Sequence, residues 1–254
     1  MAVVQIWDIE LTRQLVDAMI GLNQSMKARE SMISCQQRIQ YSLIHQETAV
    51  KLWDDYLAML SRTSARSGQL QGEEERQAEA RALLNIGANI HACVQSLHAI
   101  PDILAHALYY SIGLNHTAPA RRERDITAKS VAKSLAADAS LGELSNQLQT
   151  VYKDGEFPYL DALNNNGKHR SLIQARPLAR IGVPFEETYT LELLGFEYDD
   201  IPYEKRPAIP FLRKEHLRIF RRVMECGNTM NSILAAKTGR QSMLMFASVM
   251  EIDD

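Results

Sequence analysis

Residues 82–120 read ALLNIGANIHACVQSLHAIPDILAHALYYSIGLNHTAPA and decide the fold class of this chain. The stretch is mostly apolar, and Asp102 is the one formal charge in it. A segment this long and this poor in charge is typical of a helix that is buried in a protein core. We therefore expect a long helix over about 72–112, kinked or restarted at Pro101, where the backbone lacks an N–H group.

The same stretch is long enough to cross a bilayer. Polar residues and a proline interrupt it, however: Asn85, Asn89, His91, Gln95, His98, Pro101 and Asp102. The unbroken apolar pieces are too short for a membrane span, so a core helix is the better interpretation. We expect no membrane partner.

A second long helix is expected on the N-terminal side. Residues 22–67 contain neither Gly nor Pro, and their apolar side chains recur every three to four positions. A break within 23–31 would separate this helix from an earlier one that begins near Asp8. Residues 67–75 have the composition of a turn, and their acidic end suits the start of the next helix. The 116–125 stretch is an exposed basic connector.

The composition changes at Gly155. Six of the eight prolines fall between there and Phe211. Alternating residues in 187–193 indicate a strand, and 172–175 is a second candidate. Pro210 is expected at the first helical position of a final long helix that Gly227 could interrupt.

The predicted fold is mainly α: a long antiparallel helical bundle with a small irregular β hairpin or lid before the last long helix. We assign 1–154 to the bundle, 155–209 to a Pro/Tyr-rich insertion packed on it, and 210–254 to the C-terminal helix and tail, in one compact domain. Two short helices follow the connector, and the second opens with the capping-box spacing of Ser140 and Glu143.

Composition excludes several classes of protein. The chain has 254 residues, 46% apolar and 23% charged, with a net charge of −3, which argues against gripping nucleic acid with the whole surface. The three cysteines are too few and too far apart for a disulfide framework or a zinc site, and the N-terminus lacks signal-peptide character, so we expect a cytoplasmic protein. No nucleotide-binding, dinucleotide-binding or DNA-binding motif is present, and no cofactor is expected.

Three histidines share one face of the long helix with Asp102. At 100° per residue, His91, His98, Asp102 and His106 fall within an arc of about 80°. They could be metal ligands, although the spacing matches no named zinc motif. The alternative, which we prefer, is a hydrogen-bonded polar centre in which His98 and His106 flank Asp102.

A second group of polar residues lies in the motif PYLDALNNNGKHRSLI, residues 158–173. Asn164 and the residues after it should end a short helix, after which Lys168, His169 and Arg170 emerge together on a turn. The basic segment 168–180 suits an anionic ligand or RNA. It could also supply the cation that neutralises Asp102.

In addition to binding, the turn could carry chemistry. His169 beside a cation could act as general base on a ribose hydroxyl without a metal. A third basic group, Arg121, Arg122 and Arg124, is expected to be solvated.

The segments SLHAIPDILAHALYYSIGLN and PYLDALNNNGKHRSLI resemble a group of uncharacterised helical bacterial proteins. The matching positions are His98, Asp102, Asn164, Lys168, His169 and Arg170. This resemblance covers about a fifth of the chain and implies no activity.

The long helices with a polar focus also resemble HEPN-type proteins. The motif of that family is an Arg separated from a His by four to six residues, a spacing that Arg38 and His45 share. His169 and Arg170 have the same residue types in the reverse order. The resemblance implies a homodimeric, metal-independent RNase of a toxin–antitoxin or phage-defence system.

Three hypotheses follow, in order of preference. The first is a helical protein whose polar centre, Asp102 with Lys168-His169-Arg170, is structural or binds an anionic ligand. The second is a HEPN-like endoribonuclease that uses His169, Arg170 and Lys168. The third is a metal-binding bundle that uses the histidine face.

Overall fold

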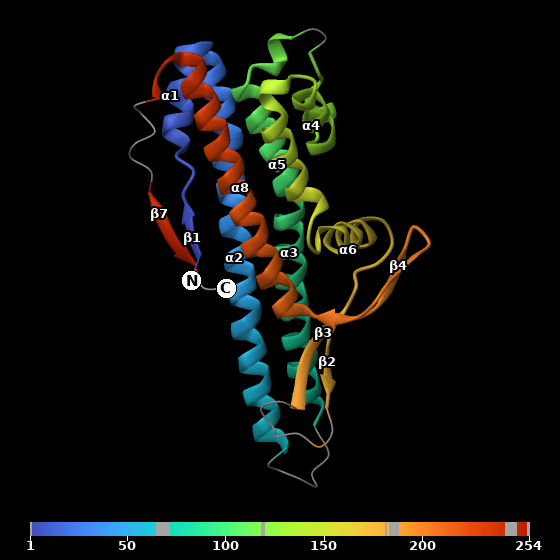
Figure 1. Cartoon of the computed structure of the whole chain (residues 1–254). Helices are drawn as coiled ribbons and strands as arrows, with labels where there is room; N and C mark the ends of the chain where they lie inside the picture. The colour runs from blue at the N-terminus through green and yellow to red at the C-terminus, as the bar shows by residue number, and fades with distance from the viewer. Residues whose placement is uncertain are drawn as a thin grey trace. The chain divides into compact units, whose positions relative to one another are not determined.

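The computed structural model describes residues 2–64, 72–117, 120–180, 182, 188–241 and 248–252. As predicted, the fold is mainly helical, with long helices and a small antiparallel strand region before the last long helix (Figure 1). No helix among these residues is both long and apolar enough to cross a membrane. The expected turn at 67–75 lies mostly outside the described residues.

The chain divides into two compact units. Unit 1 comprises 1–39, 99–157 and 217–254, and unit 2 comprises 40–98 and 158–216. These bounds differ from the three consecutive segments expected from composition. The difference arises because the three longest helices, α2 (Leu22–Ser64), α3 (Glu73–Ser111) and α8 (Ala208–Thr238), each contribute residues to both units.

Unit 1 begins with a two-stranded ribbon. Strand β1 (Ala2–Gln5) pairs antiparallel with β7 (Val249–Ile252), in a tail for which the sequence offered no interpretation. Helix α1 (Ile9–Met19) then starts where predicted, because Asp8 caps it by accepting a hydrogen bond from the backbone N–H of Leu11.

Helix α8 continues through Gly227, and the indole of Trp7 explains why glycine occupies this position. Trp7 is 1% exposed, and its ring lies against the Gly227 backbone, so that a Cβ added at position 227 would overlap it. The indole N–H donates to Thr12 at 2.8 Å, and the hydroxyl of Thr12 donates to Asn231 of α8 at 2.5 Å. Gly227 is therefore a packing residue and not a helix breaker.

The rest of unit 1 contains several shorter helices. They are η1 (Leu114–His116), η2 (Glu123–Asp125), α4 (Ala128–Ala136), η3 (Ala139–Leu141) and α5 (Gly142–Lys153). Helices α4 and α5 lie side by side (Figure 1). The predicted capping box at 140–143 is wrong: the box lies at Thr127 and Ser130, whereas Ser140 is held by Asp138.

The boundaries of α2 and α3 were also only partly predicted. The break before α2 falls at Gly21, whose φ of 119° suits glycine, and not within 23–31. Pro101 does not end α3, which continues to Ser111 as expected. Gly113, with a φ of 78°, follows that end.

In unit 2, α2 and α3 run antiparallel. Along α2, Ser42, His45 and Tyr56 contact positions progressively earlier in α3. The Cys93 thiol donates to the Ser42 carbonyl at 3.2 Å, His45 Nδ1 lies 3.1 Å from Asn89 Oδ1, and Tyr56 donates to Glu79 at 2.9 Å. These bonds give the two helices a defined register.

The remainder of unit 2 contains helix α6 (Phe157–His169) from its second residue and the strands. The strands are β2 (Ala175–Ala179), β3 (Tyr189–Leu193), β4 (Phe196–Tyr198), β5 (Ile201–Tyr203) and β6 (Arg206–Pro207). The sheet order is β2-β3-β6, and β4 and β5 form a separate hairpin. The strand predicted over 187–193 is confirmed for 189–193, and the second strand begins at Ala175, where the predicted one ended.

Aromatic rings join this hairpin to α6 and α8. The ring of Tyr159 lies edge-on to Phe196, Tyr203 and Phe211, with centroids 5.1–5.7 Å apart. The guanidinium of Arg206 lies 3.4 Å above the same ring. This cluster holds the hairpin against the helix that carries the candidate site.

Candidate functional site

The candidate site lies along α6 and at its C-terminal end. The helix ends through backbone bonds from Arg170 and Ser171 to the carbonyl of Asn166, at 2.9 and 3.1 Å. The side chain of Asn166 in turn donates to the Ser171 carbonyl at 2.7 Å. The helix continues through His169, two residues beyond the predicted end, so Lys168 and His169 belong to its last turn.

A histidine–carboxylate pair lies on the face of α6 that meets α3. His98 Nε2 is 2.7 Å from Asp161 Oδ1, and the Asn165 amide donates to the same oxygen at 3.0 Å. The His98 side chain is 20% exposed and that of Asp161 is 47% exposed. The pair is therefore sheltered but reachable by solvent.

The surroundings of Asp161 keep it ionised. The hydrogen bond with His98 lowers the pKa of the Asp161 carboxyl most, and the bond from Asn165 and the positive charge of Lys168 lower it further. Partial burial opposes these effects without cancelling them. The Asp161 carboxylate orients the imidazole of His98 through this hydrogen bond.

The three basic residues are exposed, although only Arg170 lies beyond the helix, on the turn where all three were expected. Lys168, His169 and Arg170 all point to solvent. Arg170 makes one long hydrogen bond, 3.5 Å, to the carbonyl of Glu197. Neither Lys168 nor His169 has a side-chain hydrogen bond or ion pair to any residue that the structure describes.

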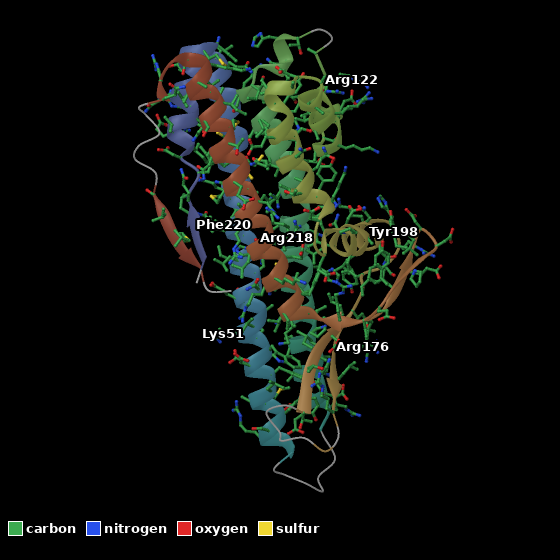
Figure 2. The ribbon with its side chains drawn as sticks, in the orientation of Figure 1. Lys51, Arg122, Arg176, Tyr198, Arg218 and Phe220 are labelled. Carbon is green, nitrogen blue, oxygen red and sulfur yellow. The ribbon has the colours of Figure 1, made fainter. Side chains whose placement is uncertain are left out.

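The rest of the basic segment 168–180 is not one turn. Arg176 lies on β2, where its Nε donates to Gln174 at 2.6 Å (Figure 2). The backbone N–H of Arg180 donates to the Thr188 carbonyl at 2.6 Å. The candidate anion site is thus restricted to residues 168–170.

Asp102 is not the buried, cation-paired carboxylate that the sequence predicted. The carboxylate is exposed, not buried, and its Oδ1 accepts a hydrogen bond from the backbone N–H of Ala128 at 2.8 Å. Ala128 is the first residue of α4, so Asp102 satisfies a free donor at a helix N-terminus. The premise that a buried charge here needs a cation is wrong. Asp102 belongs to unit 1 and residues 168–170 to unit 2.

The other histidines of the α3 face serve structural contacts. His91 Nε2 lies 2.8 Å from the carbonyl of Ile173. The ring of His106 lies 6.2 Å from that of Tyr110. Burial lowers the pKa of both His91 and His106.

The metal interpretation finds no support in the part of the chain that the structure describes. That part contains no group of three or more His, Cys, Asp or Glu side chains that could hold a metal ion. The carboxylate of Asp102 is used by Ala128, and His98 and His91 face other partners.

Three further residues singled out in the sequence, Asn164, Arg38 and His45, lie outside the His98–Asp161 pair and the exposed end of α6. Asn164 is buried, and its Nδ2 has no hydrogen-bond partner among the described residues. His45, the histidine of the HEPN-type spacing, is bonded to Asn89, and Arg38 is exposed in the other unit.

Sequence reasoning missed Asp161 and Asn165. With Lys168 they occupy positions i, i+4 and i+7 of α6, which is the signature of one helix face. That signal was present in the 158–173 motif. The spacing does not reveal the partner, because His98 lies 63 residues away in the sequence.

Comparisons of this chain with protein-family models, with curated proteins and with solved structures found no match. The function is therefore inferred from the geometry of the residues on α6.

Proposed function

We propose that the exposed end of α6 binds an anionic ligand through a phosphate group. The observation that carries the proposal is the exposure of the Lys168 ammonium and the His169 imidazole, neither of which has a side-chain hydrogen bond or ion pair to a described residue. The carboxylate on the same helix, Asp161, is already bonded to His98 and Asn165. Arg170 adds a guanidinium, which matches the geometry of a phosphate.

A purely structural role is the competing explanation. Cations in the last turn of a helix interact favourably with its dipole, typically by about 0.3–1 kcal/mol. This effect needs no ligand.

The three cysteines are buried and free, which supports a reducing compartment such as the cytoplasm.

Inorganic phosphate is the simplest probe. Titration followed by the imidazole NMR signals of His169 should show saturable shifts, with a millimolar dissociation constant because the groups are exposed. Lys168→Gln with Arg170→Gln should weaken binding at least about tenfold, since each removes a charge-assisted contact. The matched control, Lys27→Gln with Lys133→Gln, makes the same change in net charge on exposed lysines elsewhere.

A second candidate function is metal-independent RNA cleavage, favoured by the exposure of His169 between two cations. The imidazole would take the proton of a ribose 2′-hydroxyl as its oxygen attacks the phosphorus atom. The bond from phosphorus to the 5′ oxygen breaks, and that oxygen takes a proton from water. A 2′,3′-cyclic phosphate is the product, and Lys168 and Arg170 stabilise the added negative charge.

This candidate is tested separately. Purified protein should cut single-stranded RNA in EDTA, and His169→Ala should abolish cutting without changing the melting temperature. Intact RNA with the wild-type protein would remove the nuclease and leave the phosphate titration as the test of binding.

A further inference from the structure

Unit 1 contains an open cavity at the basic connector, whose Arg121, Arg122 and Arg124 are exposed as the sequence predicted. Its volume is about 500 Å³, within the usual range for small-molecule sites. The residues that line it combine two arginines, a carboxylate, hydroxyls and apolar groups: Tyr109, Leu114, Thr117, Ala120, Arg121, Arg122, Asp125 and Ser134.

The guanidinium of Arg121 is fixed at this cavity. Its Nη2 donates to the Ser134 hydroxyl at 2.9 Å and to the Ser130 carbonyl at 3.3 Å, both on α4. The Nε and Nη1 donors make no hydrogen bond to any residue that the structure describes. Arginine has five N–H donors in a rigid fork, so a fork held at one end presents the rest in a defined direction.

Tyr109 adds a buried polar group. The side chain is 2% exposed, and its hydroxyl oxygen accepts the backbone N–H of Arg121 at 2.9 Å. The hydroxyl proton has no acceptor among the described residues. A buried hydroxyl that lines a cavity and retains an unused donor is suited to an acceptor atom of a ligand.

Arg122 completes the charge of the cavity. Its Nε donates to Asp125 at 2.6 Å, while both terminal nitrogens remain without a partner in the described part of the chain. Figure 2 shows Arg122 beside α4. The cavity lining contains two guanidinium groups and one carboxylate, that of Asp125. Its formal net charge is therefore +1.

From these observations we infer that the cavity lined by Tyr109, Arg121 and Arg122 binds a small organic anion, with an oxyanion head on the arginines and an apolar body. The unused donors of Arg121 and the Tyr109 hydroxyl recognise the head. The ring of Tyr109, with Leu114 and Ala120, contacts the body. The cavity lies wholly within unit 1, so this inference is independent of the site proposed on α6.

Phenyl phosphate is the probe, because it joins an oxyanion head to an apolar body of suitable size. Titration by calorimetry of the Lys168→Gln, Arg170→Gln variant, in which the phosphate site proposed on α6 is weakened, should give one saturable site at the cavity. Inorganic phosphate has the head alone and phenol the body alone, and each should bind at least about tenfold more weakly than phenyl phosphate. Absence of saturable phenyl phosphate binding up to about 10 mM would overturn the inference.

Substitutions distinguish binding in the cavity from a general effect of the positive charge of the connector. Arg122→Gln and Tyr109→Phe should each weaken phenyl phosphate binding about tenfold, on the scale of one hydrogen bond to a charged group. Arg124→Gln makes the same charge change in the same connector but outside the cavity lining, and should leave affinity unchanged. Equal weakening by Arg122→Gln and Arg124→Gln would overturn the site.

Arg121→Gln is the strongest variant, but it also removes bonds to α4 and could unfold that helix. Circular dichroism and the melting temperature identify that outcome, and the other two variants then decide. Lys168→Gln with Arg170→Gln should leave phenyl phosphate binding at the cavity unchanged. A loss there would assign the binding to α6 instead.

Discussion

The connector of unit 1 and the end of α6 in unit 2 are both short basic segments, yet the structure uses them differently. Arg121 is tied to α4 and lines a cavity. Lys168 and His169 project into solvent from the last turn of a helix. The comparison shows that a run of cations has no fixed meaning in a sequence, because its role depends on the donors and acceptors that other elements bring to it.

Each unit also contains a carboxylate that accepts a hydrogen bond, Asp161 in unit 2 and Asp102 in unit 1. We expect substitution of these two residues to have the largest effects on the free energy of unfolding. Asp161→Ala leaves His98 without this acceptor in a sheltered position, so it should lower the free energy of unfolding by about 1–2 kcal/mol. Asp161→Asn retains an acceptor and should cost less. Urea unfolding of the two variants measures the difference, and an unchanged free energy of unfolding in Asp161→Ala would show that the pair does not stabilise unit 2.

Asp102→Ala should lower the free energy of unfolding by a smaller amount, about 1 kcal/mol. The substitution removes the exposed carboxylate that accepts the backbone N–H of Ala128 at the start of α4. A buried, charge-paired Asp102 would have cost about 3–5 kcal/mol. Chemical denaturation distinguishes the two values. A loss in the higher range would restore the sequence-based picture of a buried centre.

The fold itself was largely predictable from the sequence. The apolar, charge-poor composition of 82–120 and the apolar periodicity of 22–67, which lacks Gly and Pro, identified the long helices, and these signals are local. The role of Gly227 was not predictable, because it depends on Trp7, which packs against it from the far end of the chain.

The candidate site was predictable only in part. The turn motif grouped residues 168–170 at the end of a short helix, but their exposure was not predicted, because the preferred interpretation paired them with Asp102. The exposure of Asp102 did not follow, because isolation among apolar neighbours in sequence does not place a residue on the buried face of a helix. Asp161 and the cavity at Arg121 depend on contacts between elements distant in sequence.

Acid pH should affect both units through buried histidines. Burial lowers the pKa of His106 in unit 1 and of His91 and His216 in unit 2 below the ordinary value of 6.5. The unfolded chain therefore binds more protons than the folded one below about pH 6.5, and stability should fall as the pH decreases from there.

Urea unfolding from pH 7.5 to 5.5 measures this dependence. His106→Gln should reduce the slope by removing the contribution of unit 1. A stability that is flat over this range would contradict the burial of these imidazoles.

The smallest effect on stability is expected at the end of α6. Lys168→Gln with Arg170→Gln should change the free energy of unfolding by less than about 0.5 kcal/mol, as is usual for exposed side chains. The stability of this variant makes it a clean tool for testing function. A larger loss would mean that the turn is a structural element.

The most direct test of the account is the titration of inorganic phosphate followed at the His169 imidazole by NMR. We predict saturable shifts in the wild-type protein and in Lys27→Gln with Lys133→Gln, and binding weakened at least about tenfold in Lys168→Gln with Arg170→Gln. Shifts that do not saturate, or that weaken equally in both double variants, would contradict a phosphate site at the end of α6.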